Sequence, residues 1–118
     1  MVFPKKALVV CSNIDEVETL RLFLAENDYP LNRYWDKGFP SYFSENADRK
    51  IHEKTCYHLM PFVADRFDII GWCYPEYYFG TDFENEDVSW NYISVSDYIA
   101  KVLELNGVAN SVNALDVL

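Results

Sequence analysis

The chain has few basic residues, cysteines and glycines, and each shortage argues against a class of protein. Ten Lys and Arg stand against 19 Asp and Glu, for a formal net charge of −9, which argues against direct nucleic-acid binding. Three cysteines without a CxxC pair are not a disulfide framework and favour a reducing compartment. Four glycines and five prolines argue against repeats or disorder.

Long apolar runs are also missing. No stretch approaches the roughly 20 residues that span a bilayer. The basic start of the chain, at Lys5 and Lys6, is followed by an apolar run too short for a secretory signal. The sequence therefore predicts no membrane partner and a cytoplasmic location. At 118 residues we expect one domain, residues 1–118.

Catalytic signatures are absent as well. The chain contains no P-loop, G-x-G-x-x-G, G-x-S-x-G or H-E-x-x-H motif, so we predict no catalytic residue and no cofactor, and favour a protein that is not an enzyme. Cys56 and His58 share a face of an expected strand and resemble a nucleophile–base or zinc pair. However, Cys11, Cys73 and His52 lack ligand spacing. A structural role for these side chains and no bound metal are therefore expected.

What the chain does have is acid, concentrated in residues 61–118. That half carries ten carboxylates against Arg66 and Lys101 alone. Within it, residues 82–87 begin like a calcium loop, but an EF-hand needs Gly at position 6 and Glu at position 12, where this chain has Asp87 and Ile93. Eight aromatic residues are interleaved with the acids: Trp72, Tyr74, Tyr77, Tyr78, Phe79, Phe83, Trp90 and Tyr92. Aromatic side chains are enriched in protein interfaces, and a negative field attracts basic partners.

Hydrophobic patterning predicts an α+β domain. Residues 7–11 form a short apolar run typical of a buried strand. Ser12 or Asn13 should cap a helix that runs to about Asn27, and a second helix should begin near Ser94 or Ser96 and continue through Leu105. The other expected elements are strands over residues 31–36, 41–43, 55–63, 67–74 and 88–94, and a short helix near the C-terminus.

We therefore expect an antiparallel-rich sheet of about four to six strands, with the two main helices packed on one face. The predicted core residues are Val10, Leu20, Leu24, Ile70, Trp72, Ile99 and Leu103.

The order of elements and several segments resemble small acidic proteins that phages produce early in infection, including anti-CRISPR-like anti-defence proteins. The segments are residues 16–20, 22–29, 34–38 and 93–99. This chain has Asp28 where those patterns favour glycine. The resemblance is to this class, without a specific family within it. It implies a protein that binds and blocks a host enzyme in the host cytoplasm.

Two functions compete at this point. The first is a non-enzymatic inhibitor whose acidic, aromatic second half mimics nucleic acid and binds a basic protein, as phage anti-defence and nuclease-immunity proteins do. The predicted partner is a host nucleic-acid-binding enzyme. The partner-binding residues are predicted to be Glu76, Tyr77, Tyr78, Asp82, Phe83, Glu84, Glu86 and Asp87.

The second function is a small-ligand domain or enzyme with an aromatic-lined pocket for a nucleotide or sugar. Its predicted lining is Trp35, Trp72, Tyr74, Trp90 and Tyr92. A homodimer through the aromatic side chains is a further assembly that these residues allow. A deep pocket with convergent polar groups would favour the ligand, and a flat acidic face the inhibitor.

Overall fold

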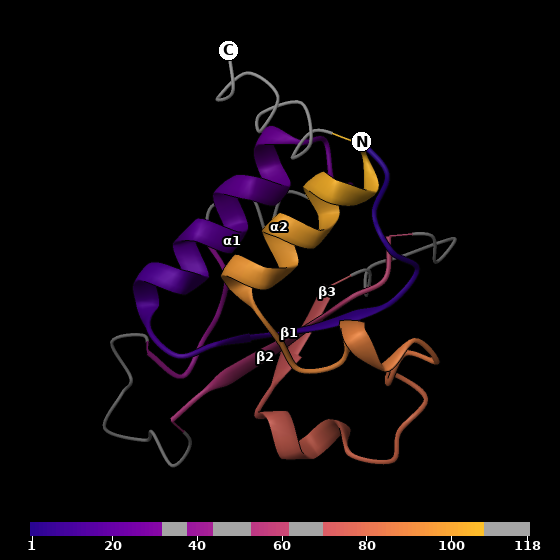
Figure 1. The fold of residues 1–118 in the computed structure, drawn as a ribbon. Helices are drawn as coiled ribbons and strands as arrows, with labels where there is room; N and C mark the ends of the chain where they lie inside the picture. The colour runs from indigo at the N-terminus through magenta and orange to yellow at the C-terminus, as the bar shows by residue number, and fades with distance from the viewer. Residues whose placement is uncertain (32–37, 44–52, 62–69, 108–118) are drawn as a thin grey trace.

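The computed structural model describes residues 1–31, 38–43, 53–61 and 70–107, which form one α+β domain (Figure 1). The elements are β1 (Ala7–Cys11), α1 (Ile14–Glu26), β2 (Thr55–Leu59), β3 (Ile70–Cys73), the 3₁₀ turns η2 (Pro75–Tyr78) and η3 (Val88–Trp90), β4 (Ile93–Ser94) and α2 (Val95–Leu105). The expected strand over 31–36 and the C-terminal helix lie in or extend into residues outside those described. Residues 41–43 do not form the expected strand, since residues 42 and 43 lie in a turn.

The four strands form one mixed sheet in the order β3-β2-β1-β4. β2 runs antiparallel to both of its neighbours, with Val9 opposite Tyr57 and Tyr57 opposite Trp72. β4 pairs with β1 in parallel, with Val9 opposite Ile93. The prediction of an antiparallel-rich sheet is therefore confirmed in part: the pairings of β1 with β2 and of β2 with β3 are antiparallel, but the sheet is mixed because β4 pairs in parallel.

Strand β1 lies inside the sheet, and its two faces enter two different cores. Ala7, Val9 and Cys11 belong to the larger core beneath the helices. Leu8 points to the opposite face, into a smaller core, and half-buried Val10 packs against it. This two-sided burial explains why β1 is a continuous apolar run, since alternation is expected only where one face meets water.

Both helices begin at the residues that the sequence indicated. The Asn13 side chain accepts a hydrogen bond from the Glu16 N–H at 2.9 Å, and the Glu16 carboxylate accepts one from the Ser12 N–H at 3.0 Å. Ser94 caps α2 through the Asp97 N–H. These contacts satisfy N–H groups that a helix leaves unpaired. Neither helix in the described residues is long and apolar enough to cross a membrane.

The helices cover one face of the sheet, as expected (Figure 1). Leu20, Leu24 and Ile70 are buried in this core, which confirms their prediction, whereas Ile99 and Leu103 are only partly buried at its margin. The prediction that Trp72 is a core residue is wrong, because its side chain is 36% exposed. It lies on the edge strand β3, where its ring meets Tyr42 edge-on at 5.1 Å.

The prediction of a strand over residues 88–94 is also wrong for most of this segment. The Asp87 carboxylate accepts hydrogen bonds from the Ser89 N–H and hydroxyl, which favours the 3₁₀ turn over an extended chain. Tyr92 then adopts a left-handed backbone conformation, with φ at 56°, and only Ile93 and Ser94 remain in the sheet. Local side-chain bonding thus overrides an alternating pattern.

Tyr98 provides a test of this core. The Tyr98 ring meets Phe23 and Trp90 edge-on, and its buried hydroxyl has no hydrogen-bond partner among the described residues. The Tyr57 hydroxyl, on an equally buried side chain, donates to the Pro40 carbonyl at 2.7 Å. An unsatisfied buried polar group costs about 1–3 kcal/mol. Tyr98→Phe should therefore leave the free energy of unfolding unchanged or raise it. The matched change Tyr57→Phe should lower it by about 1 kcal/mol.

Urea denaturation of both variants measures these changes. Equal destabilisation of the two variants would contradict the assignment of Tyr98 as the unsatisfied hydroxyl.

Candidate functional site: an acidic platform over the open sheet face

Residues 75–92 cross the sheet face that the helices leave open, and we call them the acidic platform. They connect β3 at one edge of the sheet to β4 at the other (Figure 1). The platform carries five carboxylates, Glu76, Asp82, Glu84, Glu86 and Asp87, and no Lys or Arg. It therefore contains all eight predicted partner-binding residues in one continuous piece of chain.

The inner side of the platform is apolar and forms the smaller core. Tyr78 is 1% exposed and joins Leu8 and Cys56 there. Phe83 and Tyr92 are half-buried and pack against the same cluster. Tyr78 and Phe83 were predicted to bind a partner. Tyr78 is covered by its own domain, so we leave it out of the contact surface, and Phe83 mainly supports the platform.

His58 on β2 is the main sheet contact of these rings. Its Nδ1 lies 3.0 Å from the Tyr78 hydroxyl, and its ring stacks on Phe83 with centroids 4.3 Å apart and planes 19° apart. The register places Gly71 of β3 directly opposite His58. A Cβ at Gly71 would lie 2.0 Å from the His58 Cε1, so glycine is needed there for the imidazole to occupy its place.

Hydrogen bonds fix the middle of the platform to the start of β1. The Lys6 ammonium donates to the Asp82 carbonyl at 2.9 Å, and the Asn85 side-chain amide donates to the Lys6 carbonyl. Asn91 reaches back across the platform, donating from its side chain to the Asn85 carbonyl at 2.9 Å. Polar side chains thus satisfy the backbone of a segment with little regular secondary structure.

Glu84 and Tyr92 close the platform at its far end. The Glu84 carboxylate accepts hydrogen bonds from the Gly80 N–H at 3.0 Å and from the Tyr92 hydroxyl at 2.7 Å. Burial, followed by this carboxylate, raises the pKa of the Tyr92 hydroxyl, so Tyr92 stays a donor. A left-handed conformation is unusual for a bulky side chain, and these contacts hold it in place. Glu84 therefore has a structural role.

Asp87 also has a local partner, although it is exposed. Hydrogen bonds from the Ser89 hydroxyl and N–H are the main cause that lowers the pKa of the Asp87 carboxyl, with a smaller contribution from the positive charge of Lys101. The Lys101 ammonium itself bonds the Ser89 hydroxyl and lies 4.5 Å from the centre of the Trp90 ring. Asp87 therefore stays ionised below the usual range of an aspartate.

The outer side of the platform combines charge with apolar surface. Of the predicted contact residues, Glu76, Tyr77, Asp82, Glu86 and Asp87 are exposed. Two exposed residues that the prediction left out join them: Phe79 at 61% and Val88 at 76%. Within the described residues the only ion pair is Arg21–Glu18 on α1, so no platform carboxylate forms an ion pair there. The outer surface of the platform is negatively charged and carries exposed apolar side chains.

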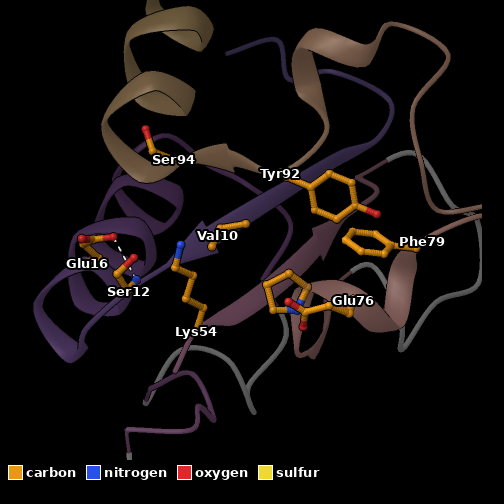
Figure 2. A pocket seen from close by; sticks show the side chains of 9 residues that line it. Val10, Ser12, Glu16, Lys54, Glu76, Phe79, Tyr92 and Ser94 are labelled. Atoms are coloured by element: carbon orange, nitrogen blue, oxygen red, sulfur yellow. Dashed lines mark hydrogen bonds between the residues drawn. The ribbon is translucent and has the colours of Figure 1, made fainter. Parts of the chain in front are cut away.

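A pocket of about 560 Å³ opens beside the platform, at the ends of β1 and β4 (Figure 2). Phe79 and Tyr92 supply aromatic walls, with their ring centroids 5.3 Å apart. Its remaining lining is Val10, Ser12, Glu16, Lys54, Pro75, Glu76 and Ser94. Figure 2 shows Lys54 between Glu16 and Glu76, and neither the Lys54 ammonium nor the Glu76 carboxylate forms an ion pair or hydrogen bond in the described part of the chain.

The aromatic pocket expected from the sequence is not the one that forms. Trp90 is buried under the helices against Tyr98, Trp72 lies on the sheet edge, and half-buried Tyr74 contacts Tyr77. Tyr92 is the one member found in the pocket, and Trp35 lies outside the described residues. Phe79 and Lys54 were missed, since neither forms a motif along the chain.

No metal centre can be built from the described residues, where no group of three His, Cys, Asp or Glu side chains comes together. His58 bonds Tyr78, while Cys56 faces Cys73 across the strands and both are free thiols. No protein-family model, curated protein or solved structure shows significant similarity to this chain.

The contact between His58 and Gly71 provides a test of how the platform is held. Gly71→Ala should displace the His58 ring, unstack Phe83 and raise hydrogen exchange across residues 75–92, with a loss of about 1–3 kcal/mol in the free energy of unfolding. In a His58→Ala background the same change should cost little, because the ring that clashes is gone.

Gly107→Ala is the control, since it strains a left-handed residue (φ 75°) where no atom of the described residues lies within 4 Å of the added Cβ. Exchange in the platform should not respond to it. Additive effects of Gly71→Ala and His58→Ala would contradict the proposed support.

Proposed function

We propose that this protein is a non-enzymatic binding protein whose acidic platform engages a basic protein partner that handles nucleic acid. The observation that carries the proposal is the two-sided build of the platform. Its inner aromatic side chains pack in the smaller core of the domain. Glu76, Asp82 and Glu86, in contrast, are exposed and have no ion-pair partner in the described residues.

The negative charge of the platform is the first argument for the proposal. Carboxylates gathered on one short segment repel one another, and no Lys or Arg within the platform offsets this. Basic side chains of a partner would relieve the repulsion, and the negative field would speed their encounter. Exposed Tyr77 and Phe79 then supply the apolar contact that keeps a complex together once formed.

The fixed backbone of the platform is the second argument for the proposal. The platform is held by Tyr78, Phe83 and Asn85, so its outer side chains start from a fixed backbone. A preorganised surface loses less conformational entropy when it binds than a disordered acidic tail does. The carboxylates of Glu84 and Asp87 already accept hydrogen bonds within the domain. Asp82 and Glu86 are therefore better candidates for charge contacts with a partner.

Nucleic-acid-handling proteins are the partner class that this surface matches best. Their binding grooves present clustered Lys and Arg to phosphates, and an ordered row of carboxylates competes for the same cations. Phage anti-defence proteins and the immunity proteins of nuclease toxins act in this way, and the resemblance of the sequence to the former agrees with it. In this proposal the protein acts in the cytoplasm as an inhibitor, without a cofactor.

Substitution of Asp82 and Glu86 by Lys tests the proposal. Both side chains are exposed and make no hydrogen bond of their own among the described residues, so folding should be unaffected. The immobilised protein is used to capture proteins from a bacterial lysate, and those retained are identified by mass spectrometry. The double variant should lose the captured partner, and duplex DNA added to the lysate should compete with the wild type.

Glu26→Lys with Glu104→Lys is the matched control. It changes the net charge equally, but on the helices at the other side of the sheet. The control should retain the partner. Equal retention by both double variants, or capture that neither salt nor DNA weakens, would refute the assignment of the platform.

The pocket favours a second candidate, which is binding of a small neutral sugar. Glu16, Glu76 and the two serines can bond hydroxyl groups, and the Phe79 ring offers an apolar face of the kind that sugar rings pack on. A nucleotide is less suited, because the two carboxylates outnumber the single ammonium of Lys54 and repel phosphate.

NMR titration with methyl glucoside and, separately, with adenosine monophosphate distinguishes these ligands. The sugar should shift resonances of Val10, Lys54 and Glu76, and Phe79→Ala should abolish the shifts. Tyr77→Ala is the control, as an exposed neighbouring ring that does not line the pocket. No shifts with the sugar, or shifts with the nucleotide alone, would refute this candidate.

A further inference from the structure

Two of the three cysteines face each other across neighbouring strands. The register pairs Cys56 of β2 with Cys73 of β3 in the antiparallel part of the sheet. Both side chains point to the face beneath the acidic platform, where Cys56 belongs to the smaller core and Cys73 packs against it. Both are free thiols in the structure.

The spacing of such a pair suits a disulfide. Directly opposed residues of antiparallel strands have Cα atoms about 4.5–5.5 Å apart, which lies within the range of about 4.4–6.8 Å that disulfides span. Their Cβ atoms are about 4.5–5.5 Å apart, slightly more than the roughly 3.5–4.5 Å that the bond prefers. Closing the bond draws β2 and β3 together locally, and such strain makes a disulfide easier to reduce again.

From this geometry we propose that Cys56 and Cys73 form a reversible dithiol–disulfide site that exchanges with low-molecular-weight disulfides such as oxidised glutathione. The two thiols have different roles. Cys73 is half-buried and can be reached from solvent, so its sulfur attacks first. Cys56 is fully buried, and burial raises the pKa of its thiol, so it acts second and from within the protein.

The exchange balances in two steps. The Cys73 thiolate attacks one sulfur of oxidised glutathione, which forms a mixed disulfide and releases one glutathione thiolate that takes up a proton. The Cys56 thiol then loses its proton and attacks the Cys73 sulfur, which closes the Cys56–Cys73 bond and releases the second glutathione. The two cysteines lose two electrons and two protons, and glutathione disulfide is reduced to two thiols.

Cys11 serves as the internal reference. It lies on the helix side of the sheet, in the larger core, whereas Cys56 lies on the opposite face. Burial and the nearby Glu16 carboxylate raise the pKa of the Cys11 thiol to about 12. Cys11 therefore neither pairs with Cys56 nor reacts while the domain is folded.

The experiment treats the folded protein with oxidised glutathione, quenches it with acid and counts thiols after unfolding. The count should fall from three to one, the intact mass should drop by two hydrogens, and peptide mapping should find Cys56 joined to Cys73. Dithiothreitol should restore all three thiols. A count that stays at three, a final product with glutathione still on Cys73, or a bridge to Cys11 would overturn the proposal.

Two variants assign the roles. Cys56→Ser removes the resolving thiol and should trap one glutathione on Cys73, whereas Cys73→Ser should leave both remaining thiols free. Circular dichroism verifies that each variant folds, and Cys56→Ala replaces Cys56→Ser if the buried hydroxyl is not tolerated. Glutathione bound to Cys56 in the folded Cys73→Ser variant would contradict the order of attack.

Discussion

Strands β3 and β4 run in the same direction at opposite edges of one sheet, and this constraint determines the rest of the molecule. A chain that joins two parallel strands has to cross a face of the sheet. The helices already cover one face, so residues 75–92 cross the other. The connection therefore also completes the second core, over Leu8 and Cys56.

The mixture of acidic and aromatic residues in this segment follows from its position. A segment that lies flat on a sheet has one side in a core and one side in water, so its side chains divide between the two. Tyr78 and Phe83 face His58, while Asp82 and Glu86 face solvent. The features that made the segment conspicuous in the sequence thus have two origins: the buried aromatic residues serve packing within the domain, and the exposed carboxylates remain available to the proposed partner.

Sequence reasoning succeeded where the signal is local. The caps at Asn13 and Ser94 and the buried run of β1 are readable because the residues that interact are close in the chain. Asp28, just after α1, has φ at 60°, a conformation in which helix ends usually have glycine. The parallel pairing of β4, the stacking of His58 on Phe83 and the pocket around Lys54 were not readable, because each joins distant segments.

The pairing of Val9 with Ile93 has a consequence for the order in which the chain folds. Strands β2 and β3 can pair early, because little chain separates them, whereas the contact of β4 with β1 closes a loop that contains most of the domain. Closing long loops costs more entropy and delays such contacts. During synthesis, β4 joins the sheet only after nearly all of the described chain has left the ribosome. Premature termination before residue 93 would therefore leave one edge of β1 open to pairing with another chain.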